Sequence, residues 1–203
     1  DLDETDGIQL ENITSHDGSI DVTAGGPITV TSVTSTTDSD TNDISLTTMS
    51  GDMGVVTIIA GSSGDVSLTS AGAITADGSD LVEVRADQLT ATAGGSITLD
   101  TTIASADLTT TASGAIEVDE TDSIELTRVT TADGSIGVTA GGPITAILVT
   151  SQTDSDANDI HLTTTTGSIS VVSISAGFVG DVSLTSAGSI SEDGTDLVAV
   201  TAD

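Results

Sequence analysis

The sequence predicts an all-β fold, a right-handed parallel β-helix (β-solenoid) without helices. Three observations carry this prediction: a repeat of fixed period, short segments in which apolar and polar residues alternate, and a composition that lacks the usual core aromatics. The 203 residues include no Trp, Tyr or Cys, a single Phe and 22 Gly. The core must therefore consist of thin layers of small aliphatic side chains.

A long repeat relates residues 3–87 to residues 119–203 without a gap, at an offset of 116 residues. The phrase GDVSLTSAG, for example, occurs at residues 64–72 and again at residues 180–188. We therefore expect residues 1–203 to form a single continuous solenoid segment. Its first long repeat would cover residues 3–118, and its second, incomplete copy residues 119–203.

A shorter repeat lies within the long one and is marked by D-x-x-D followed at once by an apolar-led segment. Four of the five spacings between markers are 37 residues and one is 42, and a fixed period in this range is typical of solenoids. We expect each 37-residue unit to hold two coils of 18–20 residues, which gives about ten or eleven coils. The markers would then recur on alternate coils along one edge. Their second aspartates are Asp6, Asp43, Asp80, Asp122, Asp159 and Asp196.

Between the markers the chain alternates with period two, as in SIDV, DVSL and SITL. In the first of these, Ile20 and Val22 are expected to point inward and Asp21 outward. No segment keeps apolar residues at the spacing of an amphipathic helix, and β-branched residues are abundant. The right hand follows from the chirality preference of parallel crossovers.

The charge balance excludes several function classes. Two basic residues against 32 acidic ones give a formal net charge of −30, which repels nucleic acid and anionic lipid headgroups. No apolar run approaches the ~20 residues of a membrane span, so no membrane insertion is expected. An enzyme is not expected either, because no Lys, Tyr, Trp or repeated His is present to tune a carboxylate for acid–base chemistry.

Two nearly identical segments, TDSDTND at residues 37–43 and TDSDAND at residues 153–159, concentrate oxygen ligands. One interpretation is a Ca²⁺ site, since this ion needs six to eight oxygens; the other is a solvated turn, since Asp and Asn favour turns. The pattern is not an EF-hand, because Asp43 stands where the sharp-turn glycine belongs. No other cofactor is expected. The candidate metal ligands are Asp38, Asp40, Asn42 and Asp43, and Asp154, Asp156, Asn158 and Asp159.

The phrases GSIxVTAGG (residues 18–26 and 134–142) and GDVSLTSAG resemble the repeat region of filamentous haemagglutinin-type adhesins and related autotransporter-like bacterial surface proteins. The resemblance covers nearly the whole chain. It implies an extracellular, cell-surface location and a structural role, as a stiff acidic rod in an adhesin stalk or surface fibre. Two alternatives stay open: a filament subunit that stacks end to end, and a Ca²⁺-dependent adhesive module.

The expected partners lie mostly outside these residues, because neither end of the segment has an evident polar cap and each would expose a sheet edge if isolated. Further repeats of the same chain, or identical chains, are expected to stack on the two ends of the rod. Host glycans or proteins would be bound through domains outside these residues.

Overall fold

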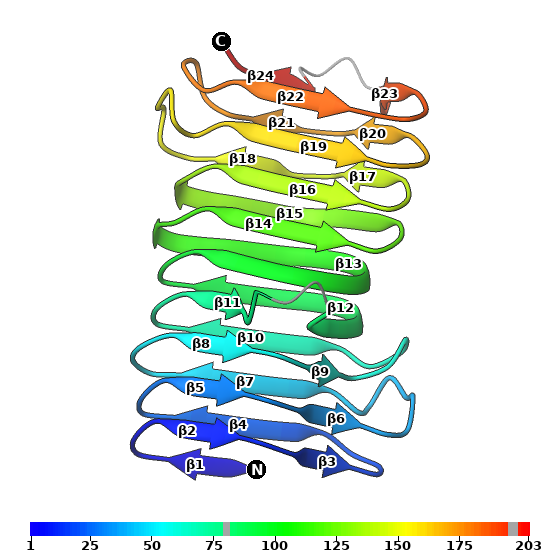
Figure 1. Ribbon diagram of the computed structural model, residues 1–203. Coiled ribbons are helices and arrows are strands. Elements are labelled where there is room, and N and C mark those ends of the chain that lie inside the picture. Colours follow the sequence, from blue (N-terminus) through cyan, green and yellow to red (C-terminus); the bar gives the residue numbers. More distant parts are fainter. Residues whose placement is uncertain (79–81, 195–198) are drawn as a thin grey trace.

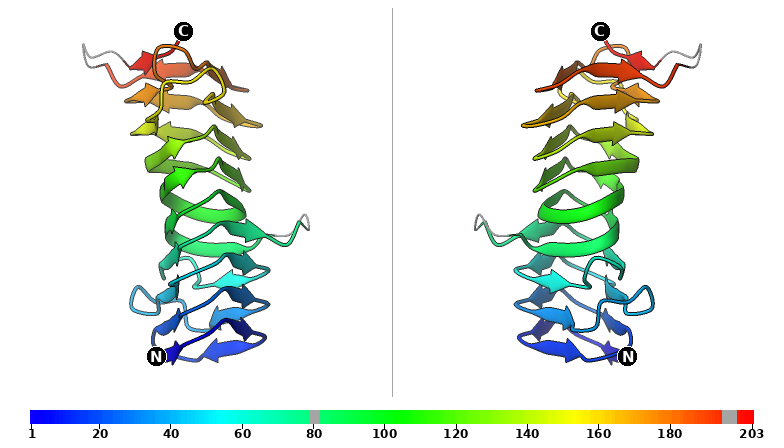
Figure 2. Two further views of the ribbon diagram at one scale, coloured as in Figure 1. Left: turned by 90° about the vertical axis from the view of Figure 1, so that its left-hand side faces the viewer. Right: turned by 90° about the vertical axis from the view of Figure 1, so that its right-hand side faces the viewer.

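The computed structural model describes residues 1–78, 82–194 and 199–203. These residues wind into a right-handed parallel β-solenoid of about nine turns, and none of them is helical (Figure 1). Their strands all belong to one hydrogen-bonded sheet that wraps around a narrow core. Two side views show a slender rod with the termini at opposite ends (Figure 2). The predicted fold class is confirmed.

Each turn contributes one strand to each of three faces, which we call faces 1, 2 and 3 in the order in which the chain visits them. Face 1 contains the second half of β12 (Val84–Ala93) and parts of β13 (Ile97–Ser113) and β15 (Ile124–Asp133). The remaining strands of face 1 are β1 (Leu2–Glu4), β4 (Ile20–Ala24), β7 (Ile44–Thr48), β10 (Val66–Ser70), β18 (Val149–Ser151), β21 (Ile174–Ser175) and β24 (Val200–Thr201).

Face 2 takes the start of β13 and eight separate strands. These are β2 (Ile8–Leu10), β5 (Ile28–Val30), β8 (Met53–Val55), β11 (Ile74–Ala76), β14 (Ile116–Glu120), β16 (Ile136–Ala140), β19 (Ile160–Thr164) and β22 (Val182–Thr185).

Face 3 takes the first half of β12, the middle of β13 and the first half of β15. Its separate strands are β3 (Ile13–Ser15), β6 (Val33–Ser35), β9 (Ile58–Ile59), β17 (Ile144–Ala146), β20 (Ile169–Val171) and β23 (Ile190–Glu192). In the middle of the rod β12, β13 and β15 continue around corners without a break (Figure 1), with register shifts between β13 and β15 after Ala106 and after Thr110.

Aliphatic columns form the core, and each column runs along one face. Burial alternates as the sequence predicts: Ile20 and Val22 are buried and Asp21 is exposed. Each fully buried aliphatic side chain contributes roughly 1.5–3 kcal/mol, an upper estimate because the unfolded chain already buries some surface. On face 2 the column consists of Ile8, Ile28, Met53, Ile74, Ile97, Ile116, Ile136, Ile160 and Val182.

The turns are longer than the expected 18–20 residues. Successive members of the face 2 column lie between 19 and 25 residues apart, so the chain completes about nine turns, not ten or eleven. The shortest step, from Ile97 to Ile116, contains no projecting loop. The longer steps include corner loops such as residues 36–43 and 152–159, and loop length adds little to the cost of closing a turn.

The expectation that the D-x-x-D markers recur along one edge of the rod is wrong. From Asp6 to Asp43 the chain passes through five strands, β2 to β6, and therefore through one and two-thirds turns, not two. As a result Asp6 precedes a face 2 strand, Asp43 a face 1 strand and Asp122 a face 3 strand. The markers thus rotate around the three corners. Asp80 and Asp196 lie outside the described residues.

The long repeat rotates in the same way. β4 lies in face 1, whereas its counterpart β16, 116 residues later, lies in face 2. Likewise β5 of face 2 corresponds to β17 of face 3, and β6 of face 3 to β18 of face 1. One long repeat therefore equals five and one-third turns, and the second copy is turned by a third of a circle about the rod axis.

Candidate functional site

The two acidic segments form projecting corner loops. Acidic loop 1 (residues 37–43) connects β6 to β7 at the corner from face 3 to face 1, and acidic loop 2 (residues 153–159) connects β18 to β19 at the corner from face 1 to face 2. Figure 1 shows the two loops leaving opposite sides of the rod. In each loop a backbone bond closes the tip, from the Asn42 N–H to the Ser39 carbonyl and from the Asn158 N–H to the Ser155 carbonyl, both at 3.0 Å.

The two asparagines are buried inside their loops. The Asn42 Nδ2 donates to the Thr37 carbonyl at 2.9 Å, and its Oδ1 accepts the Gly18 N–H of the preceding turn at 2.7 Å. The Asn158 Nδ2 donates to the Thr153 carbonyl at 3.1 Å and to the Asp133 carboxylate at 2.9 Å. Buried amides of this kind satisfy backbone groups that would otherwise cost free energy. Both side chains therefore tie the loop to its own start and to the turn before it.

The first aspartate of each loop holds the loop of the following turn. The Ser62 Oγ donates to the Asp38 Oδ2 at 2.6 Å, and the Ser63 N–H donates to the Asp38 Oδ1 at 2.8 Å. In the second copy the N–H groups of Phe178 and Val179 both donate to the Asp154 Oδ1, at 2.7 and 2.9 Å. The hydrogen bond from Ser62 is the main reason that the pKa of Asp38 lies below its ordinary value.

Glycine is required where the held loop approaches each aspartate. Gly61 has φ of 94° and Gly177 has φ of 81°, in the left-handed region that disfavours other residues. A Cβ on either glycine would lie 2.6 Å from the Oδ1 of the facing aspartate. These two glycines and the two aspartates therefore form one unit of the fold, present once in each copy.

The last aspartate of each loop continues the contact between turns. The Asp65 N–H donates to the Asp43 Oδ1 at 3.0 Å, and the Asp65 Oδ1 in turn accepts the Gln88 N–H at 3.1 Å. Burial, with repulsion from Asp43, raises the pKa of Asp65. The carboxylates thus replace missing backbone acceptors at a corner where the sheet ladder is interrupted.

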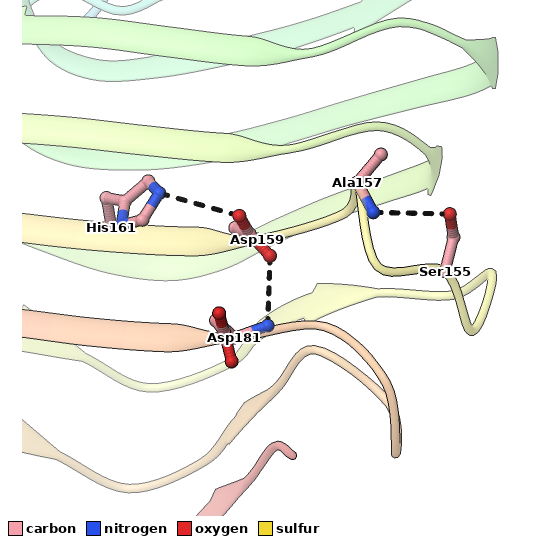
Figure 3. A network of polar contacts seen from close by, with 5 residues as sticks. All are labelled: Ser155, Ala157, Asp159, His161 and Asp181. Carbon is pink, nitrogen blue, oxygen red and sulfur yellow. Dashed lines mark hydrogen bonds and ion pairs between the residues drawn. The ribbon is translucent and has the colours of Figure 1, made fainter.

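The same contact occurs in the second copy, as Figure 3 shows. The Asp181 N–H donates to the Asp159 Oδ1 at 2.9 Å, and the Asp159 Oδ2 lies 4.0 Å from the His161 Nε2. At the loop tip the Ala157 N–H donates to the Ser155 Oγ at 3.4 Å. His161 is exposed on its strand, so a protonated ring would add only a weak surface ion pair.

Asp40 and Asp156 are the two candidate ligands left facing solvent, and no hydrogen bond is described for either. The four candidates of each loop thus point in three directions: toward the next turn, into the loop and outward. Among residues 1–78, 82–194 and 199–203, no three Asp, Glu or His side chains are grouped closely enough to hold a metal ion. Calcium binding at these loops stays a prediction, and the observed role of the loop side chains is to connect successive turns.

Two buried glutamates were not foreseen from the sequence. Glu83 is fully buried; its Oε2 accepts the Asp100 N–H at 2.6 Å, and its Oε1 has no hydrogen-bond partner among the residues that the structure describes. Burial, followed by repulsion from Asp100, raises the pKa of Glu83 to about 7. The only signal in the sequence is that Glu83 interrupts an apolar segment whose second copy has Ala199 instead.

Glu120 is better satisfied. Its Oε2 accepts bonds from the Thr101 Oγ1 at 2.8 Å and the Ile103 N–H at 3.0 Å, and its Oε1 accepts the Asp122 N–H at 3.1 Å. Burial nevertheless raises its pKa, because these bonds compensate only in part for the lost hydration.

Comparison with known proteins adds no relative: no protein-family model, no curated protein and no solved structure matches this chain. Across the part of the chain that the structure describes, no helix is long and apolar enough to cross a lipid bilayer.

Proposed function

We propose that this chain is a structural segment of a very large secreted or cell-surface bacterial protein, in which it forms a stiff acidic rod. The observation that carries the proposal is the unbroken parallel pairing along the rod axis, exemplified by the face 2 column from Ile8 to Val182. Each turn is hydrogen-bonded to the next on all three faces, so bending the rod must disturb many bonds at once.

The corner loops support the same role. Asp38 and Asp154 each hold the loop of the following turn, and Asp43 and Asp159 each accept a backbone N–H from it. These contacts extend the connection between turns to corners where the sheet hydrogen bonds stop. An adhesin stalk or a surface fibre uses this kind of construction to hold a distal domain away from the cell.

Parallel rungs of this kind can be extended in two ways, by turns of the same chain or by a second chain. Further turns of a longer chain give the stalk; a second identical chain gives the filament, which is the alternative proposal.

Small-angle scattering and sedimentation test these proposals. The isolated chain should scatter as a rod of about 43 Å, nine turns of about 4.8 Å each, and a tandem of two copies should be about twice as long with the same cross-section. A compact particle of similar length and width would contradict the rod. Sedimentation across a concentration series separates the alternatives, since a filament subunit lengthens with concentration and a stalk segment does not.

Labelling with antibodies tests the location. Antibodies raised against the chain should bind intact cells that produce the parent protein as strongly as permeabilised ones. Binding that requires permeabilisation would contradict a cell-surface role.

A further inference from the structure

A groove of about 430 Å³ opens on face 3, beside acidic loop 1. Arg85 of β12 is an exposed lining residue of the groove and lies in register between Ile59 of the preceding turn and Thr102 of the following turn. Three aspartates also line the groove, Asp38, Asp87 and Asp122, and Ile59 and Ala104 give it an apolar part. A concave surface with one cation, several acids and an apolar wall has the character of a small-molecule site.

The guanidinium of Arg85 is exposed and has no ion pair within the described residues, although three aspartates line the same groove. The other arginine behaves differently: the Arg128 Nε donates to the Asp107 carboxylate at 2.9 Å on the outside of face 1. An arginine without an ion pair is unexpected in a chain of net charge −30, where acidic side chains are abundant. Arg85 is therefore a free donor facing the groove.

The second copy of the long repeat shows which groove residues the fold needs. Asp38 and Asp87 have Asp154 and Asp203 at the corresponding positions, 116 residues later. Ile59, Ser62 and Arg85 instead correspond to Ser175, Phe178 and Thr201. The solenoid forms in both copies, so the arginine and the isoleucine are dispensable for folding, and the cation at this register belongs to the first copy.

The charges define the ligand. A guanidinium prefers a planar carboxylate, which it can bind through two parallel hydrogen bonds. Asp87 and Asp122 favour donors or cations near that carboxylate, whereas both oxygens of Asp38 already accept hydrogen bonds from Ser62 and Ser63. The field of a chain of net charge −30 repels polyanions. We propose that the groove binds a basic amino acid, free or at the C-terminus of a peptide, with the carboxylate on Arg85 and the ammonium groups facing Asp87 and Asp122.

Calorimetric titration with L-lysine at low ionic strength tests the proposal. The wild-type chain should bind L-lysine in the millimolar range, as expected for so small a ligand, and Arg85→Thr should weaken binding at least about tenfold. This substitution copies Thr201 at the same register, so the melting temperature should stay unchanged. Arg128→Thr, outside the groove, should leave L-lysine binding as it is.

Cadaverine, a diamine without a carboxylate, distinguishes binding in the groove through Arg85 from non-specific binding of cations to the acidic surface. It should bind the Arg85→Thr variant at least as well as the wild type, because the substitution removes a repelling cation. Acetyl-Gly-Gly-Lys then identifies the source: binding equal to that of L-lysine indicates a peptide terminus, and weaker binding indicates the free amino acid. The proposal is overturned if L-lysine fails to bind the wild type, or if it binds Arg85→Thr equally well.

Discussion

The Ser63 N–H donates to the Asp38 carboxylate across 25 residues of sequence, at a distance of 2.8 Å. The bond joins the loop of one turn to the loop of the next, on the outside of a corner where the sheet ladder does not reach. Asp154 makes the same connection in the second copy with the N–H groups of Phe178 and Val179.

Replacing Asp38 with Ala should release the neighbouring loop without unfolding the rod. The N–H of Ser63 loses its acceptor at a solvent-exposed position, so its hydrogen exchange should accelerate roughly tenfold while amides of β10 stay protected. Hydrogen exchange followed by NMR measures this. Asp40→Ala, in the same loop but without a described hydrogen bond, is the matched control and should leave the exchange of Ser63 unchanged.

Replacing Asn42 with Ala should be far more damaging. The substitution leaves the Gly18 N–H and the Thr37 carbonyl without their buried partner, at a cost of about 2–4 kcal/mol in the free energy of unfolding. Urea denaturation measures the loss. Thr41→Ala, at an exposed neighbouring position, should cost less than about 0.5 kcal/mol. If the two substitutions cost the same, the Asn42 amide does not have the structural role inferred here.

Because the pKa of Glu83 is raised, we expect the rod to become more stable as the pH falls from 8 toward 5. Its pKa is about 7 in the folded chain, above the value of about 4.3 expected in the unfolded chain. Between these values the folded state binds the proton more tightly, so protonation favours folding; above pH 7 both states are ionised and the buried charge destabilises the fold. Below the unfolded pKa the contribution of Glu83 is constant.

Glu83→Gln separates this effect from the general charge repulsion of an acidic chain. The variant should melt roughly 3–6 °C higher than the wild type at pH 8 and at nearly the same temperature at pH 5. Calorimetry at the two pH values measures the difference. An equal difference at both pH values would show that Glu83 does not titrate in this range.

A thermal melt in EDTA, in millimolar Mg²⁺ and in millimolar Ca²⁺ decides between the two interpretations of the acidic loops. Because most candidate ligands already accept hydrogen bonds, we expect Ca²⁺ and Mg²⁺ to raise the melting temperature equally, by screening the net charge of −30. A larger effect of Ca²⁺ that disappears in the Asp40→Asn, Asp156→Asn double variant would identify the loops as calcium sites.

The architecture could be predicted from the sequence because the alternation of apolar and polar residues identifies each strand by itself. Ile20 and Val22 point inward and Asp21 outward, as the period-two alternation predicts, and the same alternation holds in β16 and β19. The number of residues per turn could not be predicted in the same way. A 37-residue unit can be divided into two short turns or into five strands that make one and two-thirds turns. The pairing of Ile28 with Met53, 25 residues later, shows that the second division is correct.

The candidate site was predicted in part. The sequence identified the acidic loops, and the structure confirms that they occupy corners between strands. It did not reveal that the Asn42 amide is buried or that Asp38 points toward Ser62, because both facts depend on which loop lies one turn away. Glu83 was missed because acidic residues normally point outward, and its place in an apolar segment is a weak signal beside that tendency.

The one-third turn between the two long repeats gives the rod a screw symmetry. An operation of 120° combined with a rise of about 26 Å, five and one-third turns of about 4.8 Å, superimposes the first copy on the second. Three such repeats would return to the starting face, so a chain of many repeats would display each outward feature as three rows of epitopes around its circumference. A receptor, an antibody or a neighbouring rod could then approach from any direction and meet the same surface.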